Sequence, residues 1–179
     1  MNIFFTIFIG MVGLITLMLI VALFIKKDYT IVRDITIAAP KQLVFDYIKH
    51  MKNQDKWSKW VMADPNVKLE NKGTDGTVGF VVSWDSKNKQ VGKGEQEIKK
   101  IVEGEQMDLE IRFIKPFDGI AKAYFKTESM GAQTKLTWSF SSSMKYPMNI
   151  LMPIMGMEKM LGNDLAISLS NLKAILEKK

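Results

Sequence analysis

The chain has 179 residues, of which 25 are basic and 19 acidic, with a single histidine and no cysteine. The lack of cysteine excludes disulfides, thiolate nucleophiles and cysteine metal sites, and a single histidine excludes a multi-histidine metal site. The net charge of +6 comes mainly from lysines scattered among acids, which predicts a solvated surface and no nucleic-acid partner.

The first predicted element is an apolar helix. Residues 3–25 carry no charge, and at about 1.5 Å per residue this run is about 35 Å long, enough to cross a hydrocarbon core of about 30 Å. A cleaved signal peptide would need a basic start and a shorter apolar core ending in small residues, and neither is present. We therefore predict a single-pass membrane anchor over residues 1–27. Lys26 and Lys27 directly after the span favour a cytoplasmic position for the remainder of the chain.

Residues 28–179 are predicted to form one domain that begins with a strand and two short helices. Residues 29–37 alternate in hydrophobicity and are rich in β-branched side chains, as in a strand. Pro40 then opens a helix with apolar residues at helical spacing. A short turn over residues 53–60 follows and carries two tryptophans three positions apart.

Strand patterns fill the middle of the chain, separated by glycine-containing or polar turns. The predicted strands are 67–71, 77–84, 91–101, 106–114, 120–129 and 132–142. Short connections favour an antiparallel meander with one buried and one solvated face. From Leu161 to Leu176, leucines recur every three or four residues, which predicts a long amphipathic helix that starts near Met157.

This order of elements predicts an α+β fold. A curved antiparallel sheet of about seven strands would wrap around the long C-terminal helix, with the two short helices placed after the first strand. Because a strongly curved sheet need not fill its interior, a pocket is expected between the sheet and that helix.

Several local strings resemble the START/SRPBCC superfamily, which has the Bet-v-like helix-grip fold, in its polyketide cyclase/dehydrase-like branch. The strings are ITIAAPKQLVFDYI, WSKW, WDSKNKQVGKGEQEI, TKLTWSF and GNDLAISLSNLKAILE. The resemblance extends over residues 29–177. The resemblance implies a hydrophobic cavity for lipids, polyketides or other apolar molecules. Its members include cyclases, lipid carriers, quinone-binding proteins and chaperone co-activators, so the fold alone does not fix the function.

The inward phase of the strands and the segments next to it supply the predicted ligand pocket. Its residues are Trp57, Trp60, Phe80, Trp84, Gln96, Ile98, Leu109, Ile111, Phe113, Trp138, Phe140, Met152, Met155 and Leu161. Most of the strand residues among them are expected to be ordinary core. Gln96 is the polar exception and is a candidate hydrogen-bonding group for a ligand, with Gly92 and Gly94 leaving space on the same face. Trp57 and Trp60 would either cap the core, close the pocket mouth or rest on lipid headgroups.

No catalytic, metal-binding or cofactor-binding residue is predicted. Glu95 and Glu97 point to one face of a strand, but Lys93 and Lys99 share their phase, so a solvated charged face explains them better than an acid/base pair. His50 lies between lysines with no serine–aspartate arrangement of specific spacing, and we expect it to be exposed.

A methionine-rich stretch precedes the C-terminal helix. Residues 145–161 include Met148, Met152, Met155, Met157 and Met160. A copper site is disfavoured because thioether ligands are usually supplemented by cysteine or histidine. The stretch would be either core filler or an adaptable pocket wall, and Pro153 and Gly156 favour the wall.

The sequence thus favours a membrane-anchored binding or carrier domain for a hydrophobic small molecule, such as a lipid, a quinone or a polyketide-like compound. The alternatives are a polyketide cyclase/dehydrase-type enzyme and a protein-interaction module. The partners expected from sequence are the hydrophobic molecule and the membrane, whereas no protein partner can be named.

Overall fold

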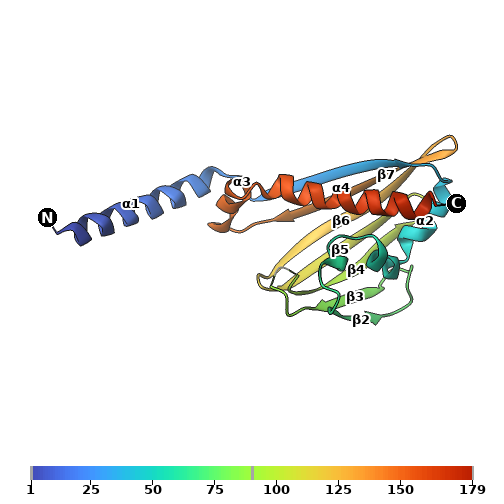
Figure 1. Cartoon of the computed structure of the whole chain (residues 1–179), viewed down its shortest axis with the longest axis horizontal. Coiled ribbons are helices and arrows are strands. Elements are labelled where there is room, and N and C mark those ends of the chain that lie inside the picture. The colour runs from blue at the N-terminus through green and yellow to red at the C-terminus, as the bar shows by residue number, and fades with distance from the viewer. Residues whose placement is uncertain (1, 90, 179) are drawn as a thin grey trace.

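The helix α1 (Ile3–Phe24) projects from one end of a curved sheet (Figure 1). The computed structural model describes residues 2–89 and 91–178, so positions 1 and 179 of the predicted boundaries lie outside it. Among these residues, α1 is the one helix long and apolar enough to cross a membrane, and a signal sequence would meet the same criteria. Its side chains are exposed, apart from Ala22 at the domain end.

Seven strands form a single antiparallel sheet. They are β1 (Asp28–Ile37), β2 (Lys68–Lys72), β3 (Val81–Asp85), β4 (Lys93–Val102), β5 (Gln106–Lys115), β6 (Gly119–Met130) and β7 (Gln133–Ser143). The order β1-β7-β6-β5-β4-β3-β2 is a meander from β2 to β7, with β1 added beside β7. The predicted strands are confirmed, but β3 begins later than residue 77. The turn before it ends at Gly79, whose positive φ of 86° is incompatible with a regular strand.

The remaining helices flank or cover the sheet. They are α2 (Lys41–Lys49), the 3-10 turns η1 (Met51–Lys56) and η2 (Val61–Ala63), a third 3-10 turn η3 (Met148–Ile150), the short α3 (Leu151–Ile154) and the long α4 (Met157–Leu176). The start of α4 at Met157 agrees with the prediction. Gly156 precedes it in the left-handed region, at φ 58° and ψ 36°, and so separates α4 from α3.

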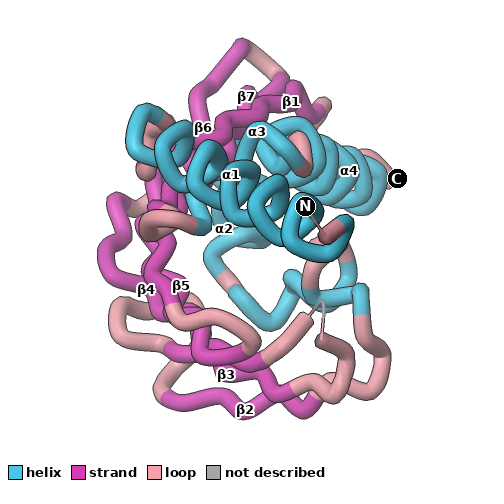
Figure 2. Tube along the Cα trace, turned by 90° about the vertical axis from the view of Figure 1, so that its left-hand side faces the viewer, coloured by secondary structure: helices cyan, strands magenta, loops and turns pink. Residues whose placement is uncertain are grey.

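The helix α4 lies along the sheet and buries its leucine stripe against it (Figure 1). Leu165, Leu169 and Leu172 of α4 are buried in the same core as Ile98 of β4 and Leu136 of β7. Figure 2 views the molecule from its α1 end, with the strands β2 to β5 curving away below the helices. The predicted α+β helix-grip architecture is therefore confirmed.

Candidate functional site

An aromatic cluster occupies the space between the sheet and the segment after α2. Trp138 of β7 is its centre, with ring centroids 4.9 Å from Phe125, 5.6 Å from Trp57 and 5.6 Å from Trp60. The ring centroids of Trp60 and Phe140 are 5.4 Å apart. Trp57 and Trp60 both contact Trp138 edge to face. Aromatic side chains packed in this way bury large apolar areas and hold one another in fixed orientations.

Two polar atoms inside this cluster are unpaired. The Nε1 atoms of Trp57 and Trp138 are buried and have no hydrogen-bond partner among the residues that the structure describes. Buried indole N–H groups are normally paired, because leaving such a donor unpaired costs on the order of 1–3 kcal/mol. The interior therefore holds two buried donors that no described residue satisfies.

The segment from Trp57 to Trp60 is fastened to α4 by polar contacts. Trp60 Nε1 donates to Asp164 Oδ2 at 3.2 Å, and Lys59 Nζ donates to the other oxygen of the same carboxylate. The backbone N–H of Lys59 donates to Ser168 Oγ at 2.9 Å. These polar contacts join the segment to α4, while the rings of Trp57 and Trp60 pack on β6 and β7, so the segment forms a cover between α4 and the sheet.

The concave face is buried at one end and partly exposed at the other. Ile98 and Leu109, which pair across β4 and β5, are buried. Gln96, Trp84 and Phe113 lie closer to the β5–β6 turn on the same face and remain partly exposed. The β5–β6 turn lies at the α1 end of the sheet (Figure 1), so the accessible part of the concave face is also at that end.

Gln96 is the polar side chain of this accessible part. It sits between Val82 and Ile111 in the register of β3, β4 and β5. Its side chain makes no hydrogen bond to the described residues, which leaves both its donor and its acceptor available.

Trp84 fills the space that the glycines were expected to leave open. Trp84 is paired with Gly94 across β3 and β4, and a Cβ atom at Gly94 would overlap its indole ring. At Gly92 the space is taken by the backbone carbonyl of Lys115. The expectation of free volume beside Gln96 at these two glycines is therefore wrong, because cross-strand neighbours occupy it.

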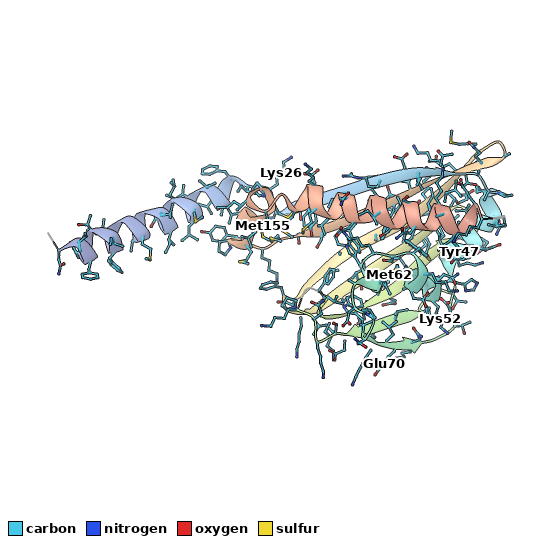
Figure 3. The ribbon with its side chains drawn as sticks, viewed as in Figure 1. Lys26, Tyr47, Lys52, Met62, Glu70 and Met155 are labelled. Carbon is cyan, nitrogen blue, oxygen red and sulfur yellow. The ribbon has the colours of Figure 1, made fainter. Side chains whose placement is uncertain are left out.

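The methionine-rich stretch lies at the end of the domain next to α1 (Figure 3). Met152 and Leu161 are half-buried, whereas Met155 is exposed and lines a surface hollow with Arg33 and Lys159. Arg33 reaches this hollow by passing over Gly162, where any side chain would overlap its guanidinium. Met155 thus belongs to the outer surface and does not line the aromatic interior.

The carboxylates of β4 lie on the outer face of the sheet. Arg112 donates to Glu95 Oε1 at 2.5 Å, to Glu97 Oε2 at 2.8 Å and to Glu110 Oε1 at 2.6 Å. These hydrogen bonds raise the pKa of Arg112, and its bond to Glu97 is the main cause of the lowered pKa of that carboxyl. These four side chains form one ion-pair network, which lies on the face opposite the concave interior.

A comparison with known families agrees with this geometry. The sequence model of the family described as "Polyketide cyclase / dehydrase and lipid transport" matches residues 29–177. The chain belongs to this family. The match begins beyond α1, so the apolar helix lies outside the matched residues.

Solved structures share the fold of this polyketide cyclase/dehydrase and lipid transport domain at low sequence identity. A truncated norcoclaurine synthase from Thalictrum flavum is 13% identical, with 86% of this chain and 97% of that chain covered and a TM-score of 0.63. Protein CV1439 from Chromobacterium violaceum is 15% identical, with 84% of this chain and 98% of that chain covered and a TM-score of 0.60. The di-domain ARO/CYC protein BexL is 11% identical, with 85% and 51% covered and a TM-score of 0.61. No curated protein sequence matches the chain.

Three residues important for the site were not singled out from sequence. Phe125 alternates with lysines on β6, and this alternation is the signal that places it on the inward face. Asp164 is one of several polar residues on α4, and nothing local distinguishes it. Asn149 is fully buried within the methionine-rich stretch, where an amide among apolar residues is the only available signal.

Proposed function

We propose that this chain is a membrane-anchored module that binds a hydrophobic small molecule in the concave interior, between the sheet and the cover formed by residues 57–60. The observation that carries the proposal is the pair of buried, unpaired indole donors on Trp57 and Trp138. They lie in an otherwise apolar, aromatic environment. The chain also belongs to a family whose description includes lipid transport.

The donors indicate the chemistry of the ligand. An apolar body would pack against the aromatic rings, and an ester, ketone, quinone or carboxyl oxygen would accept from an indole N–H. Gln96 at the accessible end supplies a second polar contact. A lipid, a quinone or a polyketide-like compound combines these features.

The anchor would place this interior beside its source of ligand. Apolar molecules partition into bilayers, and tethering a binding site to the bilayer raises its effective concentration relative to them. The accessible end of the concave face lies at the α1 end, toward the proposed membrane. Lys26 and Lys27 after α1 favour the cytoplasmic side.

Two fluorescent probes test the proposal on the full chain in detergent. One is cis-parinaric acid, a fatty acid with a hydrogen-bond acceptor, and the other is diphenylhexatriene, a pure hydrocarbon. We expect saturable binding of both, and substitution of Trp138 by Phe to weaken binding of the fatty acid only. Tyr124→Phe, which removes a hydroxyl from the outer phase of β6, is the matched control. No saturable binding of either probe would refute the proposal.

A further inference from the structure

A buried side chain of the domain, Asn149, is hydrogen-bonded to the end of α1, and we call this contact the clamp. Asn149 in η3 is completely buried, and its Nδ2 donates to the carbonyl of Ala22 at 2.7 Å and of Ile25 at 2.8 Å. The last carbonyls of a helix have no partner within the helix, so these bonds satisfy groups that would otherwise need water or another cap. Ala22 is buried against this contact, in contrast to the rest of α1.

The connection between α1 and the sheet leaves little freedom. The helix ends at Phe24 and β1 begins at Asp28. The carbonyl of Lys27 accepts a hydrogen bond from the backbone N–H of Met144 at 2.8 Å, and Asp28 is already in register with Ser143. Because β1 is already paired with β7 at this point, only a short connection separates α1 from the sheet. The orientation of the domain therefore follows the orientation of α1.

Exposed apolar side chains gather at the same end of the domain. We call them the seating surface: Phe117, Tyr146, Met148, Ile154 and Met155. Phe117 is 71% exposed and Ile154 is 59% exposed, although both are large apolar side chains. Large apolar side chains that are exposed together on one surface are typical of an interaction site.

Chain topology brings these residues together from distant segments. Phe117 lies in the β5–β6 turn, and the other four lie between β7 and α4. The two segments are neighbours, since Lys145 Nζ is 3.6 Å from Asp118 Oδ2. Figures 1 and 3 show both segments at the end of the domain from which α1 leaves.

Basic residues accompany the apolar ones. Lys26, Lys27, Lys145 and Lys159 lie on the segments at this end, with Asp118 and Glu158 as the acidic neighbours on the same segments; Asp28 follows at the start of β1. An apolar group with a small excess of lysines matches the interface of a bilayer that contains anionic lipids, which attract lysine side chains. A protein partner would have to occupy the plane at which α1 meets the membrane.

We infer that the seating surface rests in the lipid headgroup region, and that Asn149 holds the domain in this position on α1. The inference builds on the proposed membrane anchor. It adds that the domain is not tethered loosely, and that the accessible end of its concave face is held against the bilayer.

The natural lack of cysteine makes the test direct. Single substitutions Phe117→Cys and Ile154→Cys in the full chain would carry an environment-sensitive fluorophore. Met130→Cys is the control, since Met130 is 54% exposed and ends β6, whose hairpin with β7 lies at the opposite end of the domain (Figure 1). The vesicles contain phosphatidylcholine with a minor share of phosphatidylglycerol and a headgroup-region nitroxide lipid as quencher.

We expect the labels at positions 117 and 154 to shift to the blue and to be quenched, and the label at 130 to remain as in water. If all three labels behave alike while the chain floats with the vesicles, the seating surface is refuted but the anchor stands. A chain that does not float at all refutes the anchor and this inference with it. Binding of diphenylhexatriene in detergent, measured on the same samples, reports separately on the proposed ligand site.

The clamp is tested by Asn149→Ala in the Ile154→Cys background. Asn163→Ala, an exposed position on α4, is the matched control. We expect the Asn149 variant to float and to keep its far-ultraviolet circular dichroism, while quenching at position 154 falls toward that of the Met130 label. Unchanged quenching would overturn the role of Asn149. Asn149→Gln provides a second variant if the alanine chain does not fold.

Discussion

Trp57 and Trp138 meet edge to face with their ring centroids 5.6 Å apart, and neither indole N–H has a partner among the described residues. A core that served only stability would lose little with phenylalanine at either position, since the smaller ring would avoid the unpaired donor. The pair therefore supports the proposal that this interior binds a ligand.

Replacing Trp138 by Phe separates the two roles. We expect the free energy of unfolding to change little, because the lost ring area is offset by removal of an unpaired buried donor. The affinity for cis-parinaric acid should fall by about fivefold, the equivalent of one hydrogen bond of about 1 kcal/mol. Thermal unfolding and fluorescence titration measure the two quantities. A large loss of stability with unchanged affinity would assign Trp138 to the core alone.

Gly94→Ala should disrupt the accessible end of the concave face. A Cβ atom there would overlap the Trp84 indole and lie 2.6 Å from the carbonyl oxygen of Arg112. We expect a loss of about 1–3 kcal/mol in the free energy of unfolding, as for other overpacked sites. Gly119→Ala is the matched control, since no atom lies within 4 Å of its added Cβ. Equal stability of the two variants in denaturant titrations would contradict the packing described here.

Asp164→Ala should loosen the cover over the aromatic cluster. The substitution removes the carboxylate that accepts from Lys59 Nζ and Trp60 Nε1. We expect bound diphenylhexatriene to exchange about ten times faster in stopped-flow measurements, with a smaller effect on its affinity. Asn163→Ala on the same helix should exchange as the natural chain does. An unchanged exchange rate for the Asp164 variant would show that ligands do not pass this segment.

Arg112→Gln should change how stability depends on pH. The lowered pKa of Glu97 means that its pairing with Arg112 stabilises the fold above the unfolded carboxyl pKa of about 4.3. This contribution is lost as the pH falls through the lowered folded-state pKa. We expect the variant to be less stable by about 1 kcal/mol at pH 7 and the difference to shrink in more acidic buffer.

Lys52→Gln controls for the loss of one positive charge, because Lys52 is exposed on η1 and lies away from the network. Thermal unfolding of both variants over a range of pH provides the comparison. A difference for Arg112→Gln that stays constant into acid would show that the carboxylates contribute nothing to it.

The fold could be predicted from sequence because local patterns determine most of it. The alternation of Leu109 and Ile111 with Glu110 defines the two faces of β5, and the structure shows those faces. Gly156 separates the short α3 from α4, which starts at the predicted residue. Each of these signals depends on neighbours within a few positions along the chain.

The site was harder to predict because its decisive contacts join distant segments. The register that places Trp84 on Gly94 is a property of paired strands, and neither residue reveals it alone. The contact between Asn149 and Ala22 spans 127 positions and depends on how β1 meets β7. Methionines expected to form a pocket wall include Met155, which is exposed at the α1 end because that segment turns outward before α4 begins.

The proposed function requires that the full chain hold an apolar molecule in its concave interior. Native mass spectrometry of the chain, purified with its membrane and released from detergent inside the spectrometer, detects such a molecule. We predict a species heavier than the polypeptide by one apolar molecule, which diphenylhexatriene displaces and which the Trp138→Phe variant retains less well. A bare polypeptide mass under conditions that preserve the fold, with no binding of added probe, would contradict the proposed ligand-binding function.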